Sequence, residues 1–296
     1  MAIGMNTDQL VMLSVVGNVS SPRVPAGAVY RVGHDGQPHI VPATGGIAYN
    51  VRVGDRAVGW AGDHVEPAVS LRNPDDGANG GLNTFACVGN TATVVSGAAK
   101  GATGTVTGKH GGIEHVMVDF AADVLGQLVP GDQILVRAFG QGLRLDDFPA
   151  VSVSNLDPAL AAVWLTGLRD GQLVVPVAKT VPAAIMGSGL GSDNVSRGDY
   201  DITLFDPETV ETYGLADLRL GDLVAILDAG AAYGRYYRKG AVSVGVVAHA
   251  DSYKAGHGPG VTGLLSALAG EILPVVDAGA NIAALLGIGT ARPEGA

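Results

Sequence analysis

Short apolar runs separated by glycine, proline and asparagine make up most of the chain. Runs of this length with such boundaries are typical of β-strands joined by tight turns. The clearest strand candidates are residues 28–32, 91–95, 104–107, 115–120, 173–177 and 242–248. The pattern therefore predicts a β-rich α+β protein with barrel-like sheets and a few helices.

A Gly-Asp pair stands before an apolar run at three places: Gly54-Asp55, Gly131-Asp132 and Gly221-Asp222. Glycine adopts a positive φ without steric conflict, and an aspartate side chain can bond to the backbone two residues further on. Each pair therefore predicts a tight turn that leads into a buried strand. Repeated turns of this kind favour barrel-like sheets.

Helical signals are fewer. Asp157 and Pro158 form an N-cap followed by proline at the first helical position, so a helix is expected over residues 157–166. Apolar residues at helical spacing predict two further helices, over residues 261–269 and 277–286.

The charged stretch 143–149 ends in proline and marks a candidate boundary. It divides the chain into a β-rich, barrel-like N-terminal domain over 1–145 and a mixed α+β C-terminal domain over 146–296. A single globule built from both halves is the alternative. Residues 72–84 and 186–200 are expected to be long loops, which are often functional.

Composition and charge indicate which classes of protein and which partners fit this chain. Glycine accounts for 45 of the 296 residues, which fits many turns, and 47% of residues are apolar, which is enough for a large core. A net charge of −10 argues against nucleic acid as a partner. Cys87 is the only cysteine, so no intrachain disulfide forms. Neither a leader nor an apolar run of membrane-spanning length is recognisable, so we expect cytoplasmic localisation and no membrane partner.

Two short segments carry clustered ligand-type side chains. In the first, His64 and Glu66 would point to the same face of an extended segment and could bind a metal or act as acid and base. In the second, a hairpin turn could bring His110 close to His115. The plainer interpretation of both segments is a solvated turn.

The segment 186–194 is rich in glycine. Gly187 and Gly189 could let backbone amides converge on an anion, although a plain mobile loop has the same composition. Asp199 and Asp201 follow shortly afterwards and would share a face in a strand.

Aromatic and cationic residues gather in segment 228–240. Arg235 could clamp a carboxylate with its planar pair of donors, and Tyr236 could stack against the ligand. The alternative is an interface between subunits, where Tyr and Arg are also enriched. A homo-oligomer is expected on this ground.

The segment 249–262 contains the strongest single candidate. His257 stands between two glycines, before the predicted helix start at residue 261, where free amides would favour negative charge. Gly258 would let a ligand approach the backbone. Asp251 would share a face with His249 in an extended segment and could orient a catalytic group.

These motifs resemble the family DUF4438, a domain of unknown function. The resemblance rests on the motif around Gly187 and Gly189, the run from Gly198 to Ile202, the segment around Arg235, and above all residues 255–262. The family name implies no activity. The Gly-Asp turns are also similar, at the level of fold, to those of acetamidase/formamidase proteins.

The sequence leads to one hypothesis of function and two alternatives. The leading one is hydrolysis of a small polar amide or cyclic amide, assisted by a divalent metal ion. His64, Glu66 and His257 would be metal ligands or acid and base, with Asp251 as their orienting partner. The predicted substrate-binding residues are Arg235, Tyr236, Gly187, Gly189 and Gly258. The alternatives are a non-catalytic binding protein for a small carboxylate and a structural homo-oligomer.

Overall fold

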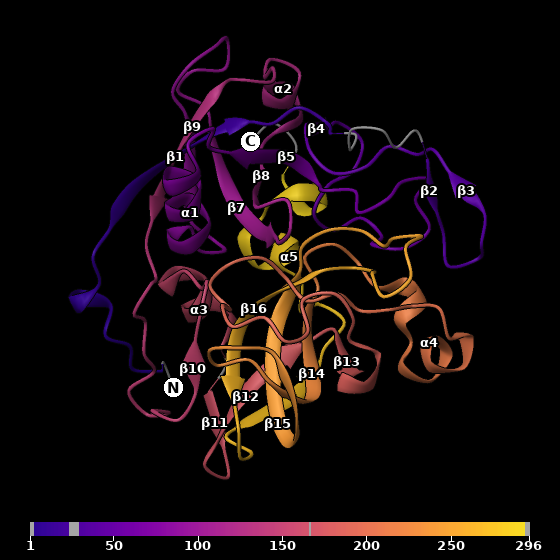
Figure 1. The fold of residues 1–296 in the computed structure, drawn as a ribbon. Coiled ribbons are helices and arrows are strands. Elements are labelled where there is room, and N and C mark those ends of the chain that lie inside the picture. Colours follow the sequence, from indigo (N-terminus) through magenta and orange to yellow (C-terminus); the bar gives the residue numbers. More distant parts are fainter. Residues whose placement is uncertain (1–2, 24–29, 166, 294–296) are drawn as a thin grey trace.

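A computed structural model of the chain describes residues 3–23, 30–165 and 167–293. It confirms the β-rich fold class, with a closed barrel and few helices. Figure 1 shows the barrel in the upper half of the molecule and the sheets of the C-terminal half below it. Whether the halves are independent domains that divide near residue 145 stays a prediction.

The barrel is closed by six strands from the first half of the chain. Its order is β1–β9–β6–β7–β8–β5, and a pairing between β5 and β1 completes the ring. A short strand, β4, extends the sheet beside β5. The bounds are β1 (Leu13–Val19), β4 (Ile47–Ala48), β5 (Ala68–Arg72), β6 (Thr91–Val94), β7 (Thr103–His110), β8 (His115–Asp119) and β9 (Gln133–Ala138).

The C-terminal half forms two further sheets. Five strands follow the order β10–β16–β15–β14–β13, and three follow the order β11–β12–β17. A small hairpin of two strands lies outside them. The bounds are β2 (Arg31–Val32), β3 (Pro38–His39), β10 (Ser152–Val153), β11 (Gly167–Arg169), β12 (Gln172–Val177), β13 (Lys179–Pro182), β14 (Leu223–Gly230), β15 (Tyr236–Val247), β16 (Val261–Ala267) and β17 (Ile272–Val276).

The described part of the chain has five short α-helices, and none is long and apolar enough to cross a membrane. They are α1 (Asp76–Phe85), α2 (Ala122–Leu125), α3 (Pro158–Trp164), α4 (Pro207–Tyr213) and α5 (Ile282–Leu286). Helix α3 lies where the Asp-Pro signal predicts it, because the Asp157 side chain accepts a hydrogen bond from the Ala159 N–H.

Two expectations about where helices lie are wrong. The expected loop over 72–84 contains α1, which the Asp75 side chain caps and which buries Leu82 against the barrel. The expected helix over 261–269 is strand β16, which is buried along most of its length. A short, fully buried strand lacks alternating polar positions, so its apolar run cannot be distinguished by periodicity from a helix.

The three Gly-Asp turns have the same local geometry. Gly54, Gly131 and Gly221 have φ values of 97°, 98° and 85°, as predicted. Each aspartate carboxylate accepts the N–H of the residue three positions earlier, and not one further on, as Asp132 does from Val129 at 3.0 Å. The second and third turns lead into β9 and β14, but the first is followed only by a single bridge from Arg56.

The two halves of the chain are joined where β7 meets β16. Thr262 Oγ1 accepts the Lys109 N–H at 2.9 Å and donates to the Lys109 carbonyl at 3.1 Å. At the other end of the chain, Arg292 pairs with Asp119 at the end of β8. Loops from both halves therefore meet at the junction between the barrel and the C-terminal sheets.

Candidate metal centre

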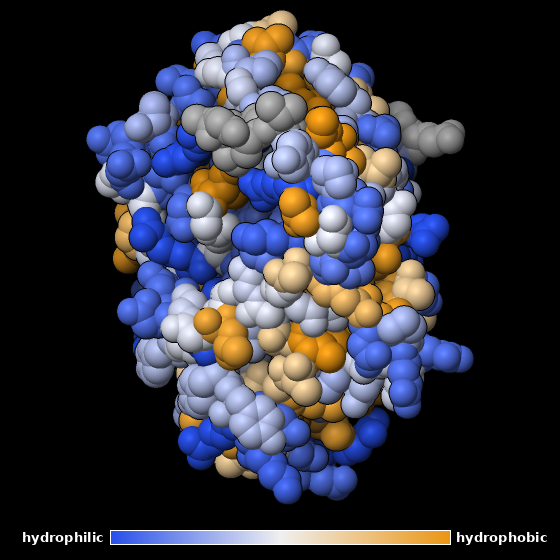
Figure 2. All heavy atoms as spheres, turned by 45° about the vertical axis from the view of Figure 1, so that its right-hand side comes forward, coloured by the Kyte–Doolittle hydropathy of each residue, from blue (hydrophilic) through white to orange (hydrophobic). Residues whose placement is uncertain are grey.

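A cleft of about 930 Å³ opens at this junction. Its lining residues come from both halves of the chain, and six of them are arginine or lysine: Arg23, Arg31, Arg72, Arg197, Arg235 and Lys254. The face drawn in Figure 2 is hollowed in its upper half, and mainly hydrophilic residues surround the hollow.

Four loops and strand ends bring histidines and aspartates into this cleft. His64 lies on the loop before β5, and His110 is the last residue of β7. The loop between β15 and β16 carries His249 and His257. The two remaining donors, Asp199 and Asp201, follow the glycine-rich segment that precedes α4. These six residues form two groups of three, in each of which one donor atom per residue lies within 4.8 Å of the others.

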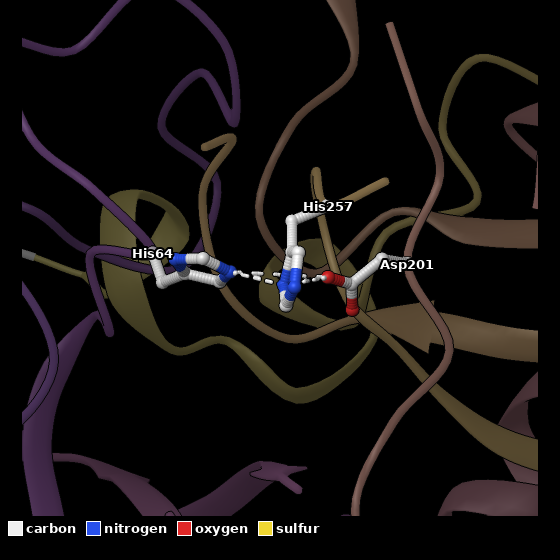
Figure 3. Close-up of side chains that lie close together, drawn as sticks. All are labelled: His64, Asp201 and His257. Atoms are coloured by element: carbon white, nitrogen blue, oxygen red, sulfur yellow. Dashed lines mark hydrogen bonds and ion pairs between the residues drawn. The ribbon is translucent and has the colours of Figure 1, made fainter. Parts of the chain in front are cut away.

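The first group is His64, Asp201 and His257, shown in Figure 3. The His64 Nε2 atom lies 3.0 Å from the His257 Nδ1 atom. Asp201 Oδ2 lies 3.3 Å from His257 Nδ1 and 3.9 Å from His64 Nε2. His64 and Asp201 are buried, whereas 22% of the His257 side chain is exposed, so the group is open on the His257 side.

The second group, His110, Asp199 and His249, is buried. Asp199 Oδ2 lies 2.6 Å from His249 Nε2. The His110 and His249 rings are stacked with centroids 4.1 Å apart. Because His64 is also near both rings, at 5.5 Å from His110 and 5.3 Å from His249, the two groups are contiguous.

Three of the histidine rings are held by an acceptor at Nδ1. His64 Nδ1 donates to Asp63 Oδ1 at 3.0 Å, and His110 Nδ1 donates to Glu66 Oε1 at 2.6 Å. His249 Nδ1 donates to the Ala250 carbonyl at 2.8 Å. Each bond places a proton on Nδ1, so Nε2 is the nitrogen that a metal ion would bind. An outer acceptor of this kind is nearly always present behind a metal-binding histidine.

Glu66 stands behind the cluster as a shared acceptor. Its carboxylate also accepts from His115 Nδ1 at 2.8 Å, from the Gly45 N–H at 2.9 Å and from the Ser70 hydroxyl. Burial alone would raise the pKa of Glu66, but the electrostatic effect of His115 and the bonds from both histidines hold that pKa well below its ordinary value. Glu66 is therefore an anion that orients rings.

Burial and neighbouring charges shift the pKa values of the cluster in opposite directions. Burial favours a neutral Asp199, but His249 and His110 outweigh it and lower the pKa of the Asp199 carboxyl. Burial by itself would lower the pKa of His249, and the Asp199 carboxylate instead raises that pKa to about 9. Burial lowers the pKa of His64, which favours the neutral imidazole that metal ions require.

The backbone at His64 is strained. Its φ is 53°, in the left-handed region that a non-glycine residue rarely adopts. The His64 N–H donates to the Asp251 carbonyl at 2.9 Å, which helps to hold this conformation. Strain of this kind occurs preferentially at functional sites, where the surrounding structure over-determines a side-chain position.

The structure brings together some of the site residues predicted from sequence. His64 and His257 are in the first group, and Glu66 is one layer behind them. Asp251 contributes its carbonyl to His64, but its carboxylate accepts the Gly59 N–H, so Asp63 is the side chain that orients His64. His257 precedes a strand and not a helix, so no helix terminus acts on it.

Some of the predicted substrate-binding residues line the cleft and others do not. Arg235, of which 4% is exposed, and Gly189 line the cleft. Tyr236 lies at the start of β15 with 40% of its surface exposed, against Gly230 and outside the described lining. A Cβ on Gly187 or Gly258 would collide with a backbone carbonyl, so these glycines permit close approach of chain segments.

Sequence reasoning assigned no role to His249, Asp199 and Asp201, and it considered His110 only as a ligand-type partner of His115. The signal for the aspartates was their Asp-x-Asp spacing, since both side chains do face one cleft. The hairpin did predict that His110 pairs with His115. Both are buried on Glu66, however, so the solvated turn is wrong for this pair.

Comparison with known proteins covers nearly the whole chain. Residues 30–162 match the family model "Domain of unknown function (DUF4438), N-terminal", and residues 164–286 match its C-terminal counterpart. A solved structure described as "Crystal structure of TM1086" is 46% identical, with a TM-score of 0.91, over 96% of this chain and 99% of that chain. The comparison with curated proteins found no match. The similarity to acetamidase/formamidase proteins is not among these findings and stays a prediction.

Proposed function

Because the chain belongs to the DUF4438 family, whose description names no activity, we propose a function from the geometry of the cleft alone. The protein is a hydrolase of a small polar amide or cyclic amide, and a divalent metal ion held by His64, Asp201 and His257 assists the reaction. Asp201 takes the place that the sequence analysis gave to Glu66.

The observation that carries this proposal is the set of oriented rings around the cleft. Two histidines and one carboxylate per group, each histidine but His257 fixed at its outer nitrogen, make a donor set suited to a catalytic metal. Three protein ligands leave coordination positions for water and substrate. A divalent ion bound there would polarise a carbonyl oxygen and lower the pKa of water.

The residues of the chain supply binding and orientation for the reaction. Hydroxide derived from water adds to the carbonyl carbon, the C–N bond breaks, and the proton of the water passes to the leaving nitrogen. Asp63 holds His64 in one tautomer throughout, and Ser252 Oγ donates to Asp63 Oδ1 at 2.6 Å. The products are a carboxylate and an amine.

Arg235 in the lining favours a substrate with an anionic group. Six of the 18 arginines and lysines of the chain line this cleft, together with five aspartates and glutamates. The Arg235 guanidinium is buried and makes its one described hydrogen bond to the Arg197 carbonyl at 3.2 Å, so its other donors are available for a ligand. A planar fork of this kind can bind a carboxylate through two hydrogen bonds.

Elemental analysis and a substrate panel test the proposal. The purified protein should contain a transition metal, and it should hydrolyse members of a panel of small amides and cyclic amides, with a preference for those that bear a carboxylate. Removal of the metal with a chelator should abolish turnover, and addition of the metal should restore it. Undiminished turnover in the metal-free protein would contradict the proposal. Iron-dependent consumption of oxygen would also contradict it, because hydrolysis consumes no oxygen.

Binding without catalysis is the second candidate, and the buried Arg235 in the lining is the observation that favours it. On this reading Arg235 and its neighbours hold a small carboxylate, and the histidine cluster only shapes the floor of the cleft. Carboxylate binding of equal affinity in metal-loaded and metal-free protein, without turnover, would favour this candidate over the hydrolase.

The exposed tyrosines of segment 228–240 bear on the assembly of the protein. Tyr233 and Tyr237 are 83% and 65% exposed beside Arg238, a composition typical of interfaces between subunits. We therefore propose a homo-oligomer, and with it the cytoplasmic location expected from the sequence. Sedimentation tests the assembly, and a monomer at all concentrations would contradict it.

A further inference from the structure

We propose that the centre is dinuclear. A second divalent metal ion binds to His110, Asp199 and His249, and Asp201 bridges it to the ion at His64 and His257. This inference rests on the proposed function, because it adds a second ion to the metal centre proposed there.

Two metal-ligand atoms of the second group are buried without a hydrogen-bond partner. Asp199 Oδ2 and His249 Nε2 lie 2.6 Å apart, but neither atom makes a hydrogen bond of acceptable geometry with any described residue. Asp199 is 7% exposed and His249 is fully buried. Leaving such groups unsatisfied is strongly unfavourable, and nearly all buried polar groups have partners. The two atoms lie at ion-pair distance without hydrogen-bond geometry, and a cation bound by both in place of the histidine proton would account for this arrangement.

Gly260 keeps the space beside these two donors free of side-chain atoms. A Cβ on Gly260 would lie 1.9 Å from Asp199 Oδ2 and 2.2 Å from His249 Nε2. The φ of Gly260 is not positive, so the backbone conformation does not require glycine at this position. Glycine at this position therefore leaves room for the side chains of Asp199 and His249.

Asp201 presents one oxygen to each group. Its Oδ2 atom lies 3.3 Å from His257 Nδ1, in the first group, and its Oδ1 atom lies 3.8 Å from His249 Nε2, in the second. A carboxylate placed in this way can bind one ion through each oxygen. In two-metal sites bridged by shared ligands, the ions lie about 3.5–4 Å apart.

His110 completes the second group from the barrel side. Its Nδ1 donates to Glu66, so Nε2 is the nitrogen that is available to a metal ion. A simple buried ion pair between Asp199 and His249 would leave His110 without a role and both facing atoms without hydrogen-bond geometry. The dinuclear centre accounts for all three residues.

Metal stoichiometry tests the second site without reference to activity. Metal-free protein titrated with Mn²⁺ should bind two ions per chain. Asp199→Asn and His249→Gln should each reduce this to one ion. Asp193→Asn is the matched control, because Asp193 is exposed on the same loop, lines the same cleft and contacts neither group, and this variant should still bind two ions.

Electron paramagnetic resonance of the unmodified chain tests the bridge and is independent of how the variants fold. Two bridged Mn²⁺ ions should give an exchange-coupled signal, and Asp201→Asn should abolish the coupling. One ion per chain in the unmodified protein would overturn the dinuclear centre and leave the proposed hydrolase standing. No bound ion would overturn both. Two uncoupled ions, unaffected by Asp201→Asn, would overturn the bridge.

Discussion

His64 Nε2 and His257 Nδ1 lie 3.0 Å apart although 193 residues separate them in the chain. His64 comes from the loop that enters the barrel at β5, and His257 from the loop between two strands of the C-terminal sheet. Neither half of the chain can form this pair alone. The cleft is therefore a property of the junction between the halves, and its chemistry depends on their packing.

Replacement of His257 separates a functional role from a structural one. His257→Ala should abolish turnover and lower the affinity of the first site for metal. The free energy of unfolding of the metal-free protein should fall by less than about 1 kcal/mol, because the side chain is partly exposed and packs little. His34→Ala is the matched control, since His34 is exposed and contacts Phe205 outside the described lining. Equal losses of activity in the two variants would contradict the role of His257.

Glu66 should act on the metal through His110. Glu66→Gln weakens the acceptor behind the ring, so metal affinity should fall by about 10–100-fold, as is usual when an outer acceptor is changed. Competition with a chromophoric chelator measures this affinity. Glu114→Gln is the control, because Glu114 lines the same cleft but pairs with Arg197 at 3.9 Å. An unchanged affinity in Glu66→Gln would show that the carboxylate has no part in metal binding.

Sequence reasoning located those parts of the fold and site that depend on local signals. The cap at Asp157, the positive φ of the Gly-Asp turns and the hairpin of β7 and β8 each follow from a few neighbouring residues. The Asp75 cap of α1 was equally local, but the glycines that follow it conceal the helix, since they have low helix propensity.

The composition of the site depends on long-range pairing and was harder to predict. Asp251 was the predicted orienting partner of the histidines, but the path of the backbone turns the Asp63 side chain, and not that of Asp251, toward His64. Likewise, His110 and His249 become neighbours only because β7 packs beside β16. Spacing in the sequence carries no information about that contact.

Cys87 should be inert in the folded protein. It is fully buried, and burial raises the pKa of its thiol to about 11. A thiol reagent such as DTNB should therefore react slowly with native protein, at a rate that rises with pH toward that value, because the thiolate is the nucleophile. Unfolded, unreduced protein should release one equivalent per chain. Rapid reaction of the native protein would show that this side chain is accessible.

Arg235 should bind the carboxylate of the substrate. In Arg235→Lys the ammonium cannot reproduce the planar pair of donors, so KM should rise by about tenfold, which corresponds to about 1.4 kcal/mol. Arg238→Lys is the control, since Arg238 is exposed in the same segment. Sedimentation of both variants separates binding from assembly. A shift of the oligomer equilibrium in Arg235→Lys, with an unchanged KM, would assign the residue to an interface instead.

The three Gly-Asp turns predict a graded series of stabilities. A Cβ at Gly131 would meet nothing within 4 Å, so Gly131→Ala should lose only the positive-φ preference, about 1 kcal/mol of unfolding free energy. At Gly54 a Cβ would lie 1.9 Å from Thr290 Oγ1, and at Gly221 it would lie 2.5 Å from Val53 Cγ1. These variants should lose a further 1–3 kcal/mol or so from overpacking.

Urea denaturation measures the series, and Gly126→Ala provides the reference. Gly126 has a φ of −65° and ordinary contacts, so alanine there should change the free energy of unfolding little. If Gly131→Ala were as costly as the other two variants, steric contact could not explain the difference between turns. Three neutral variants would remove the conformational reason for glycine and, with it, the physical basis on which the turns predicted the barrel-like sheets.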